Sequence, residues 1–210
     1  MTVKFLTVGF TLPEAWPAPE KEAAIITLFL DTGALDYFHL RKPAGDFEDY
    51  RTLLSYIPEK YHNRIIIDSN PILFQCFGLG GYHLKSKGIT PEVPVLPPGI
   101  FYTRSLHSLE ELNPSPSPVV KYSFLSPVYD SISKIGYKSN FNVEGEDLRN
   151  LLENRNIVAL GGVKPEYFKQ LYDAKFVGAA LLGYLWHPEL SLQEKIDSIL
   201  TEKDRLCCNL

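Results

Sequence analysis

The stretch Asn156–Trp186, NIVALGGVKPEYFKQLYDAKFVGAALLGYLW, decides the fold. It contains two short apolar runs, Ile157–Leu160 and Val177–Leu182, and each leads directly into glycine. Between them lies Pro165–Asp173, where proline suits the first turn of a helix and the apolar residues recur at helical spacing. Strands that are apolar on both faces are typical of a buried parallel sheet. The stretch therefore predicts a strand–helix–strand unit with a glycine turn after each strand.

The same alternation runs through the rest of the chain, which has 210 residues. Eight strand candidates alternate with about eight helical segments, and this pattern predicts a closed parallel (β/α)8 barrel, the TIM barrel. The usual barrel has about 250 residues, so this α/β chain is expected to form a trimmed one, as a single domain over 1–210. An open doubly wound sheet is the alternative, but no Gly-x-Gly-x-x-Gly motif follows the first strand. The expected strands are Val3–Val8, Tyr37–Arg41, Arg64–Ile67, Gly80–Leu84, Ile100–Thr103, Tyr122–Leu125 and the two runs quoted above.

Composition limits the classes of function. The net charge of −4 gives no basic surface of the kind that nucleic acid requires, and no apolar run approaches the ~20 residues of a membrane span. Three cysteines are too few and too badly spaced for a disulfide framework or a zinc site. These observations predict a cytoplasmic protein without nucleic-acid or membrane partners. The tail Cys207–Leu210 is expected to fray beyond the final helix, which begins at the capping box Ser191-x-x-Glu194.

The two glycine turns are candidates for phosphate binding. In (β/α)8 barrels, the turns after the last two strands commonly hold a phosphate, because glycine leaves backbone N–H groups uncovered. Gly161-Gly162 and Leu182-Gly183 occupy these positions. The alternative is that the glycines only permit tight turns.

Several further motifs fall at predicted strand ends, in a fixed order. They are His39-Leu40-Arg41-Lys42-Pro43, Asp68-Ser69-Asn70, Gly78–Leu84 (GLGGYHL), Ser105-Leu106-His107-Ser108, Ser126–Lys134 (SPVYDSISK), Leu160-Gly161-Gly162-Val163 and Gly178–Gly183 (GAALLG). In this order they resemble the motifs of the family of thiamine phosphate synthase and the thiazole tautomerase TenI. The resemblance covers about residues 37 to 186 and implies the barrel fold already predicted.

The resemblance also implies a reaction, in which a pyrimidine diphosphate joins thiazole phosphate to give thiamine phosphate and diphosphate. The partners would be small phosphorylated pyrimidine and thiazole ligands, with a homodimer as an open alternative to a monomer. Catalytic roles are implied for Arg41, His107 and Lys134. Substrate-binding roles are implied for His39, Asp68, Ser105, Ser131, Ser133, Gly161, Gly162, Leu182 and Gly183.

Two other functions stay open beside the synthase. His107 matches the histidine that the tautomerase uses for proton transfer, and a group with a pKa near 6.5 can take and return a proton at neutral pH. The chain could instead be a barrel that binds a phosphorylated ligand without catalysis. Without the resemblance, His107 would be interpreted as a helix-cap or loop residue. His83 is expected to be structural, with its neutral ring bonded to backbone groups.

Magnesium is the expected cofactor of the family, but its ligands are largely missing here. The family's metal-binding aspartate falls on Ser69, which leaves Asp68 as the one remaining candidate ligand. Lys85-Ser86-Lys87 stands where the family has a second carboxylate. Magnesium requires oxygen ligands, usually carboxylates, so weak binding is expected. The diphosphate would then depend on nearby cations, with Arg41, Lys42, Lys85, Lys87 and Lys134 as the candidates.

Overall fold

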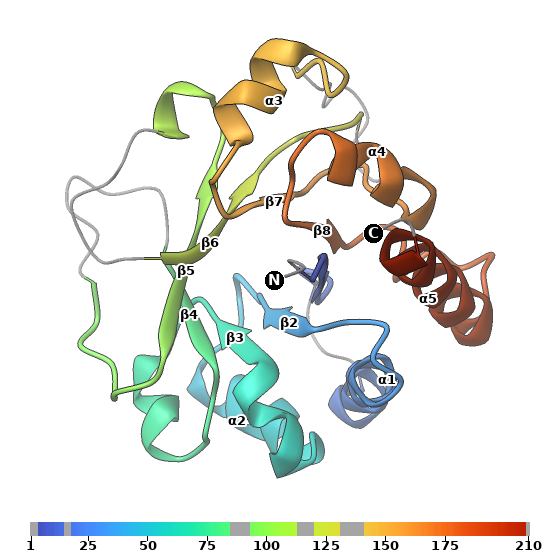
Figure 1. The fold of residues 1–210 in the computed structure, drawn as a ribbon. Helices are drawn as coiled ribbons and strands as arrows, with labels where there is room; N and C mark the ends of the chain where they lie inside the picture. Colours follow the sequence, from blue (N-terminus) through green and yellow to red (C-terminus); the bar gives the residue numbers. More distant parts are fainter. Residues whose placement is uncertain (1–3, 15–17, 85–92, 113–119, 131–140, 209–210) are drawn as a thin grey trace.

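Eight parallel strands close into a barrel and follow one another around it in sequence order (Figure 1). The computed structural model describes residues 4–14, 18–84, 93–112, 120–130 and 141–208. Strand β1 pairs with both β2 and β8, and this pairing closes the barrel. The predicted (β/α)8 barrel is therefore confirmed. The strands are β1 Leu6–Phe10, β2 Tyr37–Leu40, β3 Ile65–Ile67, β4 Gly81–Leu84, β5 Phe101–Leu106, β6 Val120–Leu125, β7 Ile157–Ala159 and β8 Gly178–Leu181.

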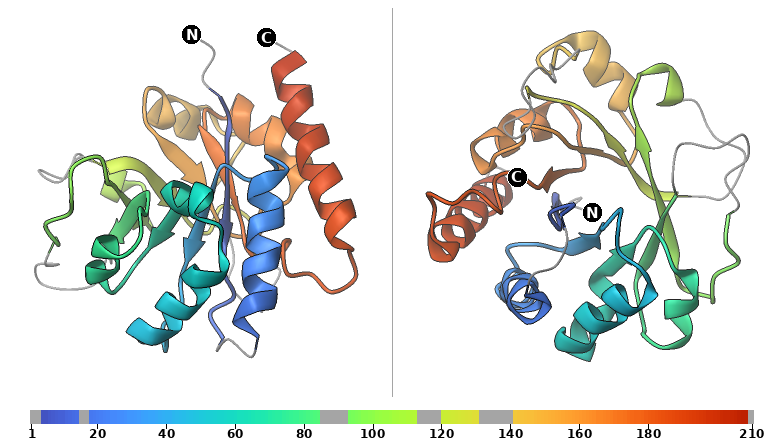
Figure 2. Two further views of the ribbon diagram at one scale, coloured as in Figure 1. Left: turned by 90° about the horizontal axis from the view of Figure 1, so that it is seen from below. Right: turned by 180° about the vertical axis from the view of Figure 1, so that it is seen from behind.

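Helices surround the strands, and α1 and α5 lie side by side outside β1 (Figure 2). The α-helices are α1 Pro19–Asp31, α2 Phe47–Tyr56, α3 Glu146–Leu152, α4 Phe168–Asp173 and α5 Leu192–Cys208. The 3-10 helices are η1 Glu59–Arg64, η2 Pro71–Gln75, η3 Glu110–Leu112 and η4 Pro165–Tyr167. Among the described residues, none of these helices is long and apolar enough to cross a membrane.

Two expectations about chain ends need correction. The first strand is Leu6–Phe10 rather than Val3–Val8, because Phe10 still pairs with His39 of β2. The final helix continues through Cys208, so the expected fraying at Cys207 and Cys208 is wrong. The apolar side of this helix stays in the core as far as Leu206, which stabilises its last turn.

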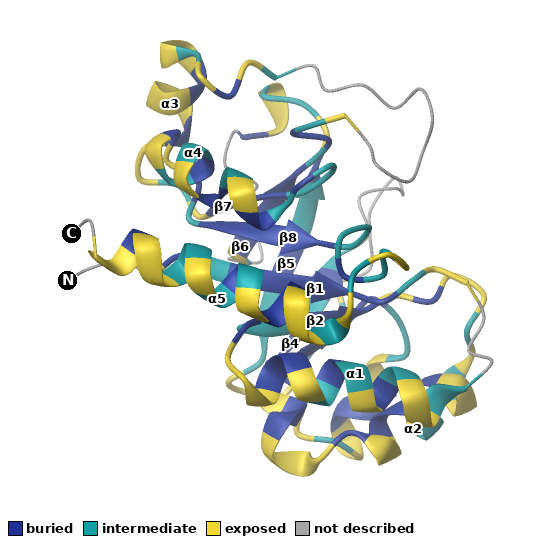
Figure 3. Cartoon of the chain, turned by 90° about the vertical axis from the view of Figure 1, so that its right-hand side faces the viewer, coloured by how far each residue is buried: buried dark blue, intermediate teal, exposed yellow. Residues whose placement is uncertain are grey.

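The core has two layers, and the strands separate them. Inside the barrel, six side chains pack together, and the remaining buried apolar residues lie between the strands and the surrounding helices. Figure 3 shows most strand residues as buried and the outer faces of the helices as exposed. The six inner residues are Val8, Phe10, Tyr122, Phe124, Val158 and Ala180.

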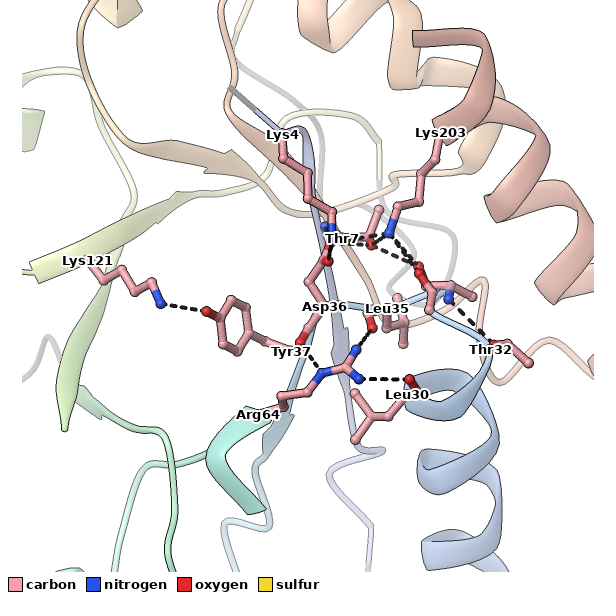
Figure 4. Close-up of polar contacts among 12 residues, drawn as sticks. Lys4, Thr7, Leu30, Thr32, Leu35, Asp36, Tyr37, Arg64, Lys121 and Lys203 are labelled. Carbon is pink, nitrogen blue, oxygen red and sulfur yellow. Dashed lines mark hydrogen bonds and ion pairs between the residues drawn. The ribbon is translucent and has the colours of Figure 1, made fainter. Parts of the chain in front are cut away.

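A polar cluster around Asp36 fastens the amino-terminal ends of the first strands (Figure 4). The Asp36 carboxylate accepts hydrogen bonds from the Thr7 N–H at 2.9 Å and from Lys203 Nζ of α5 at 3.2 Å, and it pairs with Lys4. Burial by itself raises the pKa of Asp36, but the charges of Lys203 and Lys4 and the Thr7 N–H outweigh it, so the pKa lies below its ordinary value. The cluster therefore holds β1, the start of β2 and α5 together.

Replacing Asp36 by asparagine is expected to lower the free energy of unfolding by about 3 kcal/mol, because it leaves a largely buried lysine without its counter-charge. Urea unfolding measures the change. Asp173→Asn is the matched control, since Asp173 pairs with Lys169 on the surface of α4 and such pairs contribute about 0.5 kcal/mol or less. Equal losses in the two variants would show that the Asp36 cluster does not hold the barrel closed.

Candidate active site at the carboxyl ends of the strands

The candidate residues gather at one end of the barrel, because the carboxyl ends of parallel strands share one rim. Arg41 follows β2, Asp68 follows β3 and His107 follows β5. Gly161 and Gly162 come after β7, and Leu182 and Gly183 come directly after β8. The predicted Ser131, Ser133 and Lys134 lie outside the described residues.

The Arg41 guanidinium is an exposed cation on the rim beside β2 and β3. The main chain of Arg41 is held by Thr11, whose hydroxyl accepts the Arg41 N–H at 2.9 Å and donates to the Arg41 carbonyl at 3.1 Å. The Arg41 side chain is 55% exposed, and its Nε lies 3.8 Å from Oδ2 of Asp68. A guanidinium in this position is open to an anionic ligand and is paired with a single carboxylate oxygen.

Lys42 does not supply a second cation to this rim, contrary to the expectation. Its side chain is only 3% exposed, and its Nζ lies 3.0 Å from Glu22 Oε2 on α1. Burial raises the pKa of Glu22 despite the attraction of Lys42. The pair anchors the loop after β2 to α1.

The barrel interior below the rim contains two buried histidines. His39 Nε2 lies 2.9 Å from the Tyr122 hydroxyl, and the ring stacks on Phe10. His83 contacts hydroxyl groups through both ring nitrogens, at 2.8 Å to Thr103 and 3.1 Å to Ser105. The structural role expected for His83 thus involves side chains rather than the backbone. Substrate contacts of His39 and Ser105 stay predictions.

Burial keeps both histidines neutral at pH 7. It lowers the pKa of His83 to about 4, with a smaller contribution from the charge of Arg41. It also lowers the pKa of His39 well below its ordinary value, with help from His83. The two imidazoles therefore add polar but uncharged groups beside the apolar cluster of the interior.

A glycine turn follows β7 and packs against the loop after β6. Gly161 and Gly162 have φ angles of 93° and 65°, in the left-handed region that favours glycine. A Cβ on Gly162 would lie 2.3 Å from the Asp130 carbonyl oxygen and 2.8 Å from Tyr129 Cβ. The two glycines therefore form a tight turn, and a side chain at residue 162 would displace the loop at Tyr129 and Asp130.

The N–H groups of these turns have no protein acceptor within the described part of the chain. The amides of Gly161, Gly162 and Gly183 donate no hydrogen bond to another described residue. The turn after β8 is anchored beside β1, since the Trp186 indole N–H donates to the Phe10 carbonyl at 2.8 Å. Amides of this kind can receive the oxygens of a phosphate.

His107 is exposed on the rim after β5. Its backbone N–H donates to Glu111 at 2.8 Å, and its ring Nδ1 lies 3.3 Å from the Ser126 carbonyl oxygen. Because a carbonyl can only accept, Nδ1 carries the proton and Nε2 of the neutral ring has the lone pair. This tautomer can remove a proton from a ligand in the mouth of the barrel.

The described residues do not form a metal site of their own. They include no group of three or more His, Cys, Asp and Glu side chains that could hold an ion. Asp68 Oδ1 accepts a hydrogen bond from Tyr50, and Oδ2 faces the Arg41 guanidinium. Both oxygens of Asp68 thus already have partners, and one carboxylate does not match the oxygen-rich coordination of magnesium.

Sequence reasoning missed the residues that support the rim from behind. Thr11, Glu22 and Tyr50 each contact the loop after β2. Tyr50 has the spacing of an ordinary core residue, and Glu22 has that of a solvated first turn. No local pattern in the sequence indicates these contacts.

The fold and the site define the class of protein, a closed (β/α)8 barrel whose candidate site residues lie on the rim at the strand carboxyl ends. No family model matches the chain. The chain is 30% identical in sequence to thiamine phosphate pyrophosphorylase from Bacteroides thetaiotaomicron. The crystal structure of that protein matches the present structure over 97% of each chain, with a TM-score of 0.73. The chain therefore belongs to the thiamine phosphate synthase (pyrophosphorylase) family, which confirms the resemblance seen in the motifs.

Two further proteins are similar to the chain. Thiamine phosphate pyrophosphorylase from Pyrococcus furiosus is 15% identical over 97% of this chain and 98% of its own, with a TM-score of 0.68, and shares the fold. The thiamine-phosphate synthase of Streptococcus suis is 26% identical over 138 residues. That match spans 65% of this chain and 60% of the relative.

The glycine turn can be tested as an anion site with Gly162→Ala. The new Cβ would force the loop at Tyr129 and Asp130 away from the turn, so the affinity for thiazole phosphate should fall by about tenfold. Titration calorimetry measures it. Gly33→Ala is the matched control, because Gly33 has a φ of 74° but no atom within 4 Å of the new Cβ. If Gly162→Ala and Gly33→Ala bind equally well, the turn is not the phosphate site.

The neutral histidines predict a loss of stability in acid. Between about pH 4 and pH 6.5 the unfolded chain binds a proton at residue 83 and the folded chain does not, so His83 alone should lower the free energy of unfolding by about 1.4 kcal/mol per pH unit as pH drops, and His39 should add to this slope. Urea unfolding across this window measures the slope. His83→Gln, which can still bond to both hydroxyls, should flatten it, and an unchanged slope would show that His83 is protonated in the fold.

Proposed function

We propose that the chain is a thiamine phosphate synthase, which couples hydroxymethylpyrimidine diphosphate with thiazole phosphate. Membership of the family supports the proposal. The observation that carries it is the presence of two anion-receptive positions on one rim, the Arg41 guanidinium after β2 and the glycine turns after β7 and β8. The reaction needs both, since one substrate carries a diphosphate and the other a phosphate.

In the proposed reaction, the bond between the pyrimidine methylene carbon and the diphosphate oxygen breaks, and its electron pair leaves with the diphosphate. The thiazole nitrogen then donates its lone pair to the methylene carbon. Arg41 stabilises the charge that develops on the diphosphate, and the glycine amides hold the thiazole phosphate. Positioning the two substrates side by side lowers the entropic cost of their reaction.

The uncharged interior suits the pyrimidine end of this reaction. Ser105 offers a hydroxyl, and the neutral histidines below it add no charge beside the forming carbocation-like methylene. The predicted Ser131, Ser133 and Lys134 lie outside the described residues, as do Lys85 and Lys87, and their roles complete the proposal. Among the described residues Arg41 meets the diphosphate charge, and the free protein should hold magnesium weakly, because Asp68 is a single carboxylate.

A thiazole tautomerase is the second candidate, and the geometry of His107 favours it. With Nδ1 directed at the Ser126 carbonyl, the Nε2 lone pair is available to move a proton on thiazole phosphate. This reaction needs the phosphate position but no site for diphosphate.

A turnover assay with both pairs of substrates tests the proposal. Wild-type protein should form thiamine phosphate. Arg41→Ala should lower kcat/KM for the pyrimidine diphosphate about 100-fold, because it removes a donor that stabilises developing charge, and should leave the KM for thiazole phosphate unchanged.

Arg51→Ala is the matched control, since Arg51 is an exposed arginine of α2 that pairs with Glu48. Formation of no thiamine phosphate by the wild type would overturn the synthase proposal. If the wild type isomerises thiazole phosphate and His107→Asn does not, the protein is a tautomerase instead.

A further inference from the structure

A single buried phenol joins the carboxyl ends of β2 and β3. Tyr50 of α2 is fully buried, and its hydroxyl lies 2.9 Å from the Lys42 backbone nitrogen and 3.0 Å from Oδ1 of Asp68. A carboxylate only accepts and an N–H only donates, so the phenol gives its proton to Asp68 and accepts from Lys42. The two strand ends are thus held by one oxygen atom.

This contact fixes the direction of the Asp68 carboxylate. With Oδ1 bonded to Tyr50, the other oxygen, Oδ2, faces Arg41 at 3.8 Å. Burial, together with the neighbouring charge of Asp68, raises the pKa of Tyr50 to about 12. The phenol therefore stays a donor to the carboxylate at any working pH.

The Arg41 side chain has few other restraints. Thr11 bonds only to the main chain of Arg41, and Lys42 is turned back toward Glu22 on α1. Among the described residues, Asp68 is the one carboxylate within ion-pair distance of the guanidinium. The orientation of an arginine that is 55% exposed thus depends on a carboxylate that Tyr50 holds.

We propose that Tyr50 is a positioning residue for the diphosphate-binding end of the site, acting through Asp68 on Arg41. The proposal rests on the synthase function for the identity of the substrate, but its geometry requires only that Arg41 binds a diphosphate. Tyr50 presets the guanidinium so that its planar donors meet two oxygens of the anion together. The thiazole phosphate position lies at other strand ends and is independent of Tyr50.

The test compares Tyr50→Phe with the wild type, because phenylalanine keeps the buried ring and removes only the hydroxyl. Titration calorimetry with inorganic diphosphate is expected to show about tenfold weaker binding. The KM for the pyrimidine diphosphate should rise by a similar factor, while the KM for thiazole phosphate stays unchanged. Unfolding in urea confirms that each variant is folded at the assay temperature.

Tyr61→Phe is the matched control, because the Tyr61 phenol also donates to a carboxylate, that of Asp31, away from the rim. It should bind diphosphate as the wild type does. In the double variant Arg41→Ala/Tyr50→Phe, the diphosphate affinity should equal that of Arg41→Ala alone. A residue that acts only through Arg41 has no effect on binding once Arg41 is removed.

The possible results separate this inference from the synthase proposal. If the wild type binds inorganic diphosphate but forms no thiamine phosphate, the synthase proposal fails while the binding data still decide the role of Tyr50. Equal diphosphate affinity in Tyr50→Phe and wild type overturns the inference. The inference is also overturned if Tyr50→Phe weakens diphosphate binding by the same factor in the Arg41→Ala background as in the wild type. It is overturned as well if the wild type does not bind diphosphate.

Discussion

The pairing of β1 with β8 turns a row of strands into a ring and places every strand end on a common rim. The register aligns Leu6 with Gly178, and a Cβ on Gly178 would lie 2.4 Å from the Leu6 carbonyl oxygen. Glycine is therefore required where the barrel closes. Asp36 stabilises the same amino-terminal end of the barrel by joining β1 to α5. The rim at the other end can consequently carry exposed, functional side chains without weakening closure.

The distribution of charge follows from this architecture. Inside the ring, His39 and His83 are buried and stay neutral, and they bond to hydroxyl groups instead of ions. At the rim, Arg41 is exposed and faces one carboxylate. The candidate site thus combines neutral imidazole and hydroxyl groups below the rim with an exposed cation on the rim itself.

Local patterns predicted the strands, the order of the units and the rim positions, because apolar runs that end in glycine or polar residues are visible in short windows. They could not predict contacts between distant residues. His39 meets Tyr122 across the barrel, 83 positions away, and the Tyr50 hydroxyl reaches Asp68 from a helix that looks like ordinary core. The sequence suggested that Lys42 is a cation of the rim, but its ammonium group is buried against Glu22. This contact depends on how α1 packs against the loop after β2, which a local sequence pattern does not reveal.

The central claim is that one rim carries two separate anion positions. A crystal structure of the protein with thiazole phosphate and inorganic diphosphate tests it most directly. The account predicts the phosphate within hydrogen-bond distance of the Gly162 and Gly183 amides and the diphosphate on the Arg41 guanidinium. Both anions at a single position, or a phosphate that contacts neither the Gly162 nor the Gly183 amide, would contradict it.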